Sequence, residues 1–410
     1  MGAVLKILFV HQNFPGQFLH LAPALAERGH EVVALTDESN TRSSPITTFR
    51  YRKPDPRPDP KIARMGTTFG EMTNRAHRVA RAAVVLRDKH GYQPDVIFGH
   101  GGWGETLFLR EVWPKARMLL YAELYYAPRG LDVGFDPEFG KADDEKAFTV
   151  VARQGHQALM MAQADAALSP TEFQADTFPD CFRDKITIIH DGVDTKRLAP
   201  NSTASVTLPD GPTLHAGDEV LTFINRNLEP YRGYHSFMRA LPAVMRARPR
   251  AQIVIIGGDD VSYGARPGDG KTWKNIFLDE VRDRIDLSRV HFTGKVPYAT
   301  FVGLMQVTRV HCYLTVPFVL SWSMLEAMSA GALVVGSRTS PVEELITDGE
   351  NGRLADFFDT TKLAETLIDS LARWQDFAPL RAAARAHIVE NYDLHSICLP
   401  RLVAFVEDRL

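Results

Sequence analysis

The sequence is poor in cysteine and has no long apolar run. Its 410 residues include three cysteines, Cys181, Cys312 and Cys398, which lie far apart. Thiols so few and so scattered predict neither a disulfide framework nor a zinc site, and they favour a reducing, cytoplasmic compartment. No uninterrupted apolar stretch reaches the 18 residues that indicate a membrane-spanning helix. The short apolar run up to Val10 is typical of a buried strand rather than of a signal peptide.

A strong net charge is also absent, because the formal charge is −3. We therefore expect no general attraction to nucleic acid. Between Thr41 and His90, however, twelve Lys or Arg residues stand against four Asp or Glu residues. Residues 41–90 form either a solvated loop and helix face or a surface for an anionic lipid or acceptor. The second interpretation predicts peripheral contact with the inner face of a membrane.

Apolar strands alternate with helical patterns along most of the chain. Residues 5–10 and 31–35 are predicted strands around a helix over 18–28, which begins a doubly wound sheet. Residues 41–60 are expected to be irregular, residues 74–90 helical, and the turn HGGWGE after the strand 95–98 is expected to lead into a helix.

The apolar pattern lapses over 190–201 and then restarts with a strand at 220–225. The sequence thus predicts an α/β protein of two Rossmann-like doubly wound domains facing across a cleft. We place the domains at 1–195 and 196–391, with a terminal helix over about 392–410 packing back on the first. A dinucleotide oxidoreductase is disfavoured, because no G-x-G-x-x-G follows the first strand.

Two arginines flank the start of a predicted helix in the second half. Arg226 follows the strand 220–225 and Arg232 precedes the helix 233–246. Guanidinium groups beside a helix N-terminus suit a diphosphate, although many surface helices carry flanking arginines. A second predicted helix starts near Ser321 or Ser323.

The second predicted helix places Glu326 one turn inside. That carboxylate either accepts ribose hydroxyls or simply interacts with the helix dipole.

Polar residues also follow predicted strands in the first half. Gly16 lies in the turn after the first strand, His100 follows another, and Glu123 follows a third among tyrosines. Glycine lets the backbone approach a phosphate. A carboxylate among aromatic rings is expected to have a raised pKa and to accept a proton or a hydrogen bond. Each of these residues alone is more often structural than catalytic.

Taken together, these segments resemble the family 4, group 1 glycosyltransferases of the GT-B fold. The resemblance covers nearly the whole chain and is strongest from Asn225 to Gly352. The matching motifs are Arg226, Arg232-Gly233, Leu325-Glu326-Ala327-Met328, Glu344, Asp348-Gly349-Glu350-Asn351-Gly352, Gly192-Val193-Asp194 and Ser169-Pro170-Thr171.

The resemblance implies a retaining enzyme that uses a nucleotide-diphosphate-sugar donor without a bound metal or other cofactor. Its implied donor-binding residues are Gly16, Arg226, Arg232, Val296, Ser321, Trp322, Ser323 and Glu326. Its implied catalytic residues are His100, Glu123, Arg226 and Arg232. The arginines would hold the diphosphate and neutralise the leaving group, Glu326 would bind the ribose, and the loop containing Val296 would face the base. The acceptor is left open among a glycan, a glycolipid and a small molecule.

One residue departs from the family pattern. Members often have a glutamate near the donor sugar, eight residues before the one at the Glu326 position, and this chain has Phe318 there. Backbone amides near 321–323 are then expected to contact the sugar hydroxyls. Other interpretations stay open: a nucleotide-sugar epimerase, a phosphorylase or another GT-B enzyme, or a nucleotide-sugar binder without catalytic activity.

Overall fold

The computed structural model describes residues 3–52, 66–209, 211–268 and 270–408. The chain forms two compact units. Unit 1 consists of Met1–Asp191 and Cys398–Leu410, and unit 2 is Gly192–Ile397. The sequence places the corresponding boundaries after 195 and 391.

Unit 1 is built around a parallel sheet, which has seven strands among the described residues. The strand order is β3-β2-β1-β4-β5-β6-β7, and every neighbouring pair is parallel. The strands are β1 (Lys6–Val10), β2 (Glu31–Asp37), β3 (Thr47–Tyr51), β4 (Val96–His100), β5 (Arg117–Tyr121), β6 (Ala166–Ser169) and β7 (Ile186–Ile188). The order reverses between β1 and β4, so the carboxyl ends of these two strands flank the place where α/β folds bind ligands.

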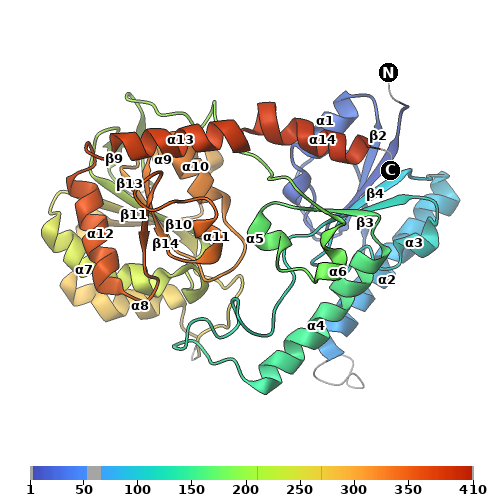
Figure 1. Cartoon of the computed structure of the whole chain (residues 1–410), viewed down its shortest axis with the longest axis horizontal. Helices are drawn as coiled ribbons and strands as arrows, with labels where there is room; N and C mark the ends of the chain where they lie inside the picture. The colour runs from blue at the N-terminus through green and yellow to red at the C-terminus, as the bar shows by residue number, and fades with distance from the viewer. Residues whose placement is uncertain (1–2, 53–65, 210, 269, 409–410) are drawn as a thin grey trace. The chain divides into compact units, whose positions relative to one another are not determined.

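Helices cover both faces of this sheet (Figure 1). They are η1 (Gly16–Phe18), α1 (Leu21–Glu27), α2 (Thr67–His90), α3 (Leu109–Val112), α4 (Asp144–Gln163), α5 (Glu172–Ala175), α6 (Asp180–Arg183) and α14 (Leu399–Glu407). Apolar side chains of α1 and α14 pack with alternate residues of β1 and β4. The intervening residues of the same strands pack with α2 and α3 on the other face. Burial on both faces explains why these strands are almost wholly apolar.

The last helix, α14, packs against the first α-helix, α1. Arg28 and His30, just after α1, both contact the carboxylate of Glu407 at the end of α14, at 2.5 and 2.9 Å. Phe405 and Val406 are buried in the same cluster as the α1 residues. The C-terminal helix is therefore part of the core of unit 1.

Unit 2 repeats the doubly wound plan with a parallel sheet of six strands among the described residues. Their order is β12-β11-β10-β13-β14-β15, again with all neighbours parallel. The strands are β10 (Val220–Asn227), β11 (Gln252–Gly258), β12 (Val290–Gly294), β13 (Val310–Tyr313), β14 (Leu333–Ser337) and β15 (Arg353–Ala355), and a separate antiparallel hairpin joins β8 (Ser205–Thr207) to β9 (Thr213–His215). The order reverses between β10 and β13.

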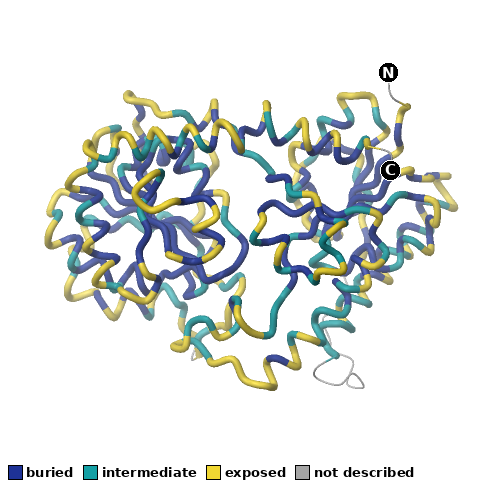
Figure 2. Tube along the Cα trace, in the orientation of Figure 1, coloured by how far each residue is buried: buried dark blue, intermediate teal, exposed yellow. Residues whose placement is uncertain are grey.

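Helices of unit 2 also pack on both faces of its sheet (Figure 1). They are η3 (Pro230–Arg232), α7 (Tyr234–Ala247), α8 (Trp273–Val281), η4 (Arg282–Arg284), η5 (Leu287–Arg289), α9 (Tyr298–Val307), α10 (Trp322–Ala330), α11 (Ser340–Glu343), α12 (Thr360–Ala372) and α13 (Ala378–Tyr392), followed by η6 (Leu394–Cys398) at the boundary. Side chains of α9, α10 and α13 share one apolar core with β10 and β14. The helix α7 contacts both α8 and α12. In both units the central strands are largely buried, whereas most of the exposed residues lie on loops and on helices (Figure 2).

Three local expectations are wrong. Within 41–60, the residues Thr47–Tyr51 form β3, because threonine and aromatic side chains favour a strand and β2 offers a parallel edge. The helix expected over 18–28 is split into η1 and α1, since Pro23 has no N–H for an α-helical bond to Leu19. After His100 the chain makes turns, and α3 is only four residues long.

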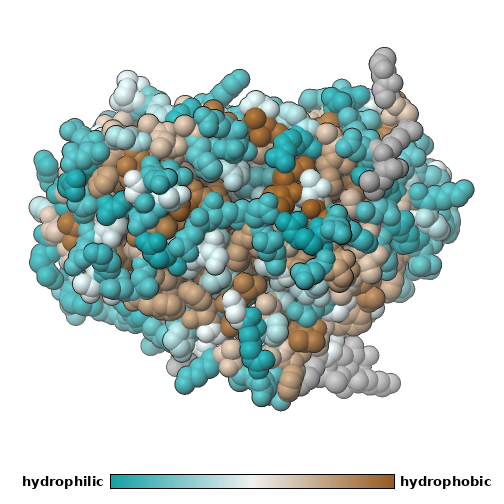
Figure 3. All heavy atoms as spheres, viewed as in Figure 1, coloured by the Kyte–Doolittle hydropathy of each residue, from teal (hydrophilic) through white to brown (hydrophobic). Residues whose placement is uncertain are grey.

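The described residues contain no helix that is both long enough and apolar enough to cross a bilayer. The visible surface in Figure 3 is mostly hydrophilic, with apolar atoms in separate groups. Residues 53–65, part of the basic stretch 41–90, lie outside the described residues. The described part of that stretch includes β3 and α2, and on α2 the side chains of His77, Arg78, Arg81 and Lys89 are exposed.

Candidate functional site

The ligand-binding edge of unit 1 carries a chain of polar side chains. β1 ends at Val10, β4 at His100 and β5 at Tyr121, so His11, His100 and Glu123 meet at the carboxyl ends of adjacent strands. The rings of His11 and His100 stand perpendicular, with centroids 5.3 Å apart. The structure thus brings together two of the predicted catalytic residues, His100 and Glu123, with a histidine that the sequence analysis does not single out.

His100 is buried and held in one orientation. Its Nδ1 accepts a hydrogen bond from the backbone N–H of Gly102 (3.0 Å), and its ring stacks on Tyr121 (5.4 Å). Because Nδ1 is an acceptor, a ring proton is assigned to Nε2. Nε2 lies 3.6 Å from Glu123 Oε2. His100 therefore presents an N–H to the carboxylate of Glu123.

Gln17 connects His11 to Glu123. The backbone N–H of Asn13 donates to His11 Nδ1 (2.9 Å), so His11 Nε2 carries the proton and donates to Gln17 Oε1 (3.0 Å). Gln17 Nε2 then donates to Glu123 Oε1 (3.2 Å). Burial lowers the pKa of His11 well below its usual value, and the nearby His100 lowers it further. His11 is therefore neutral, and the amide of Gln17 links it to the carboxylate of Glu123.

Gly16 lies directly beside this chain. Its φ is +49°, and a Cβ at this position would stand 2.8 Å from His11 Nε2. Both the left-handed conformation and the close approach require glycine. A side chain here would displace the imidazole that begins the hydrogen-bond chain.

In unit 2 the corresponding edge is dominated by Arg232, which belongs to η3 and is buried. Its Nη1 donates to Thr315 Oγ1 and to the carbonyl of Val319, both at 2.8 Å, and lies 3.5 Å from the Tyr313 hydroxyl. Gly233 makes this placement possible, because its φ is +65° and a Cβ there would lie 2.4 Å from Leu314 Cβ. Arg232 is thus held against the end of β13.

Aromatic rings surround the Arg232 guanidinium. It lies 5.2 Å from the ring centroid of Tyr263 and 5.6 Å from that of Phe318. Phe318 also meets Tyr231 edge-on (5.2 Å) and Tyr263 at a tilt (4.9 Å). We call Tyr231, Tyr263 and Phe318 the aromatic cluster. Phe318, at the position where the family often has an acid, is therefore a buried packing partner of the arginine.

Glu229 fixes the loop that carries Tyr263. Its buried carboxylate accepts hydrogen bonds from the backbone N–H groups of Ser262 (3.0 Å), Tyr263 (3.2 Å) and Gly264 (3.3 Å). Hydrogen bonds to a charged acceptor contribute about 1.5–3 kcal/mol each. This internal anion orients Tyr263 toward Arg232.

The N-terminus of α10 lies next to Arg232. Ser321 is its N-cap, and the backbone N–H of Ser321 donates to the Tyr313 hydroxyl (2.7 Å). Ser321 Oγ is 3.2 Å from Ser323 Oγ. Trp322 is exposed, whereas Ser323 is buried. Arg232 and the N-terminus of α10 therefore both contact Tyr313.

Glu326, one turn into α10, is paired with Tyr298 of α9. The Tyr298 hydroxyl donates to Glu326 Oε1 (3.3 Å). Burial raises the pKa of Glu326 to about 7, and the bond from Tyr298 opposes this rise. Val296, in the turn before α9, is half-buried against the core that includes α10. The predicted ribose and base residues thus lie on neighbouring segments.

Arg226 makes no polar contact with the other predicted residues of unit 2 within the described part of the chain. It lies within β10, which extends to Asn227, and its side chain is exposed. Among the residues that the structure describes, it forms no hydrogen bond or ion pair with Arg232, the residues 321–323 or Glu326.

Two family models match the chain. "Glycosyl transferase family 4 group" matches residues 28–198, mostly within unit 1, and "Glycosyl transferases group 1" matches residues 218–373 of unit 2. The chain belongs to the family 4, group 1 glycosyltransferases. This confirms the family, the GT-B fold class and the transferase activity expected from the motifs.

Relatives and solved structures agree with this assignment. The glycosyltransferase is 22% identical to a glycogen synthase of Mycobacterium tuberculosis, over 96% of this chain and 92% of that protein. It is 29% identical to a phosphatidyl-myo-inositol mannosyltransferase of Mycobacterium leprae, over 47% of this chain and 49% of that one. It shares its fold with Anabaena Alr3699/HepE, whose structure is a complex with UDP-glucose, at 15% identity and a TM-score of 0.62, covering 98% and 99% of the two chains.

Sequence reasoning missed several polar residues of the glycosyltransferase. His11 directly follows the first strand, so the rule that led to His100 and Glu123 would also have found it. Gln17 and Glu229 carried no such signal, because their roles depend on contacts across loops. Tyr263 becomes a neighbour of Arg232 only when the loop after β11 folds back, and the ring of Tyr231, the residue before Arg232, then contacts it.

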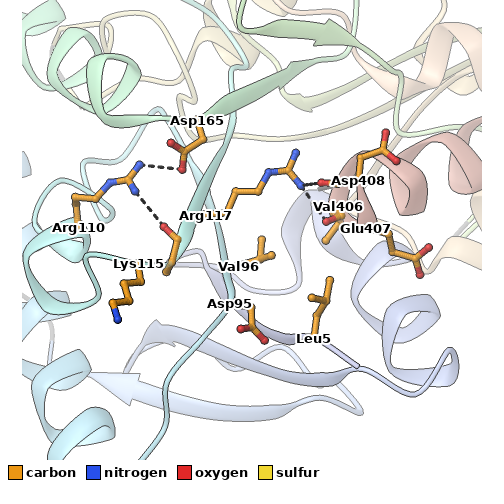
Figure 4. A pocket seen from close by; sticks show the side chains of 11 residues that line it. Leu5, Asp95, Val96, Arg110, Lys115, Arg117, Asp165, Val406, Glu407 and Asp408 are labelled. Carbon is orange, nitrogen blue, oxygen red and sulfur yellow. Dashed lines mark hydrogen bonds and ion pairs between the residues drawn. The ribbon is translucent and has the colours of Figure 1, made fainter. Parts of the chain in front are cut away.

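A pocket of about 510 Å³ lies at the opposite, amino-terminal edge of the unit 1 sheet. Figure 4 shows Arg110 pointing to Asp165 and Arg117 pointing to Asp408 at the end of α14. Arg117 attaches α14, since it also donates to the carbonyls of Phe405 and Val406, whereas Arg110 also donates to the carbonyls of Ala116 and Gln163. Both arginines are therefore engaged within the fold, at the edge away from the carboxyl ends of the strands.

Proposed function

We propose that this glycosyltransferase moves a sugar from a nucleotide-diphosphate sugar to an acceptor with retention of the anomeric configuration. The observation that carries the proposal is Arg232 beside the N-terminus of α10 at the strand-order reversal of unit 2. Guanidinium N–H groups and helix N-termini both favour phosphate oxygens. The UDP-glucose complex of Alr3699/HepE, a protein of the same fold, supports a nucleotide-sugar donor.

In this proposal, different residues bind different parts of the donor. Arg226 and Arg232 bind the diphosphate and neutralise the charge that develops on the leaving group. Glu326 accepts hydrogen bonds from the ribose hydroxyls, and the turn at Val296 faces the base. Ser321, Trp322 and Ser323 offer hydroxyls and backbone N–H groups to the sugar, because Phe318 supplies no carboxylate. Gly16 is the donor-binding residue of unit 1 in this proposal, because a residue without a side chain lets a phosphate approach its backbone.

His100 and Glu123 act on the sugar side of the reaction. The Glu123 carboxylate, held by Gln17 and His100, is placed to accept a hydrogen bond from a sugar or acceptor hydroxyl. In this proposal the leaving diphosphate departs from the same face that the acceptor attacks, so no protein nucleophile is needed. Cations and helix dipole take the electrostatic role that a metal has elsewhere, and no cofactor is required.

We further propose a cytoplasmic enzyme that contacts an anionic membrane through 41–90. The exposed Arg78, Arg81 and Lys89 on α2 support this idea, because Lys and Arg side chains near a bilayer surface each contribute about 1 kcal/mol. The match to a phosphatidyl-myo-inositol mannosyltransferase agrees with it. Co-sedimentation with anionic vesicles that vanishes at high salt would support this contact, and equal recovery in the supernatant with and without vesicles would refute it.

A thermal-shift screen of nucleotide sugars tests the main proposal. A true donor at 100 times its Kd adds about 2.7 kcal/mol of stability. The selected donor is then incubated with and without an acceptor panel, and NMR coupling constants give the anomeric configuration of the product. Interconversion of the donor alone would indicate an epimerase, tight binding without any transfer a non-catalytic binder, and an inverted product would overturn retention.

A further inference from the structure

Two arginines of unit 1 lie close to His11, beyond the hydrogen-bond chain. Arg42 comes from the β2–β3 connection and donates to the carbonyl of Asn13 (3.4 Å). Arg75, on α2, donates from Nη1 to Gln12 Oε1. The positive charges of both arginines lower the pKa of His11, after burial and His100. Two guanidinium groups from separate elements thus converge on the turn after β1.

These two charges are not matched by ion pairs. Among the described residues, neither Arg42 nor Arg75 has a carboxylate oxygen within 4 Å. Asp37 accepts from the backbone N–H of Ser39 (2.9 Å) and from its hydroxyl (2.6 Å). Glu105 accepts from the Tyr51 hydroxyl; burial raises the pKa of Glu105 to about 7, and the nearby charge of Arg75 opposes this rise. The carboxyl groups nearby therefore leave the positive charge only partly compensated.

The arginines also have hydrogen-bond capacity to spare. A guanidinium has five N–H donors, whereas each of these arginines has one polar contact among the described residues. The Nε of Arg75 is buried without an acceptor there. Leaving a buried donor of a charged group unsatisfied is costly, which favours a missing anionic partner.

We propose that Arg42 and Arg75 bind a phosphate group of the acceptor. A phosphate offers several anionic oxygens to two converging guanidinium groups, which suits it better than a neutral hydroxyl. The site lies in unit 1 beside His11, whereas the arginines assigned to the donor diphosphate belong to unit 2. The acceptor role rests on the proposed function above; the phosphate site itself rests only on unit 1. The phosphate belongs either to a soluble phosphomonoester or to a phospholipid headgroup.

The test uses the full chain and sn-glycerol 3-phosphate as the soluble probe, with glycerol as the uncharged control. Calorimetric titration should show binding of the phosphate and none of glycerol. Arg42→Gln and Arg75→Gln should each weaken it by about tenfold, the loss expected for one charge-assisted contact. Arg246→Gln, at an exposed arginine of unit 2, is the matched control and should leave it unchanged. Arg75→Lys should restore part of the affinity, which separates charge from misfolding.

A second arm uses vesicles of phosphatidylcholine with 30% phosphatidylglycerol. Wild-type binding to these vesicles but not to glycerol 3-phosphate, lost in both glutamine variants, would assign the phosphate to a lipid. Equal behaviour of Arg42→Gln, Arg75→Gln and Arg246→Gln with both probes would overturn the proposal, as would wild type that binds neither. Nucleotide-sugar affinity is measured on the same variants. If the wild type bound no nucleotide sugar, the proposed donor would be refuted but the phosphate site would stand. If the variants lost nucleotide-sugar affinity together with phosphate binding, Arg42 and Arg75 would be reassigned to the donor.

Discussion

The two units have the same strand order around their reversal points, but the chemistry at those points differs. In unit 1 the strand ends carry imidazole, amide and carboxylate groups that pass hydrogen bonds from His11 through Gln17 to Glu123. In unit 2 they carry a guanidinium, three aromatic rings and a helix N-terminus around Arg232. Strand topology therefore fixes where a ligand binds, while loop residues decide whether the site suits an anion or a hydroxyl.

The largest expected effect comes from removing the cation of unit 2. Arg232→Ala should weaken donor binding by about 1.5–3 kcal/mol, roughly 10- to 150-fold, because a charge-assisted contact is lost. Calorimetry with the nucleotide sugar selected above measures this. Arg232→Lys keeps the positive charge but loses the planar guanidinium, which can donate two parallel hydrogen bonds, so it should recover only part of the affinity. Unchanged donor affinity in Arg232→Ala would show that the cation of unit 2 does not bind the donor, and the proposed difference between the units would be wrong.

A pH dependence of about tenfold is expected from Glu326. Its pKa of about 7 means that a proton competes with ribose hydroxyls for the carboxylate. From pH 8 to pH 6 the ionised fraction falls about tenfold, and donor affinity should fall with it. The folding stability changes with pH in the opposite direction. Because the folded-state pKa of Glu326 exceeds its ordinary value of 4.5, the contribution of this group to stability decreases as the pH rises from about 4.5 to 7.

Two variants sharpen the Glu326 prediction. Glu326→Gln should abolish the pH slope of donor affinity. Tyr298→Phe removes the bond that holds the pKa down and should move the midpoint to higher pH. A midpoint that stays fixed in Tyr298→Phe, or a slope that persists in Glu326→Gln, would mean that another group titrates.

Apolar periodicity sufficed to predict both doubly wound sheets, because strands buried on two faces must be apolar. It also led to His100, Glu123 and Arg232, which follow strands or precede helices. It could not indicate that Arg226 lies inside β10, because the strand ends in the polar residues Asn225–Asn227. Nor could it indicate that Phe318 packs on Arg232, because the aromatic cluster around Arg232 includes Tyr263 from a distant loop. Glu229 holds that loop through hydrogen bonds to backbone N–H groups, which do not appear in the pattern of side chains along the sequence.

The smallest expected effect tests the hydrogen-bond chain of unit 1. Gln17→Leu removes the link between His11 and Glu123, two bonds of about 0.5–1.5 kcal/mol each. We expect turnover to fall several-fold while donor affinity, set by Arg232, is retained. Gln17→Glu keeps the bond from His11 but places a carboxylate against Glu123, so it should be slower than Gln17→Leu. Steady-state kinetics with both substrates varied separates the two quantities. If Gln17→Leu lost donor affinity and kept its turnover, the polar chain would belong to donor binding, and the division of labour between the units would have to be redrawn.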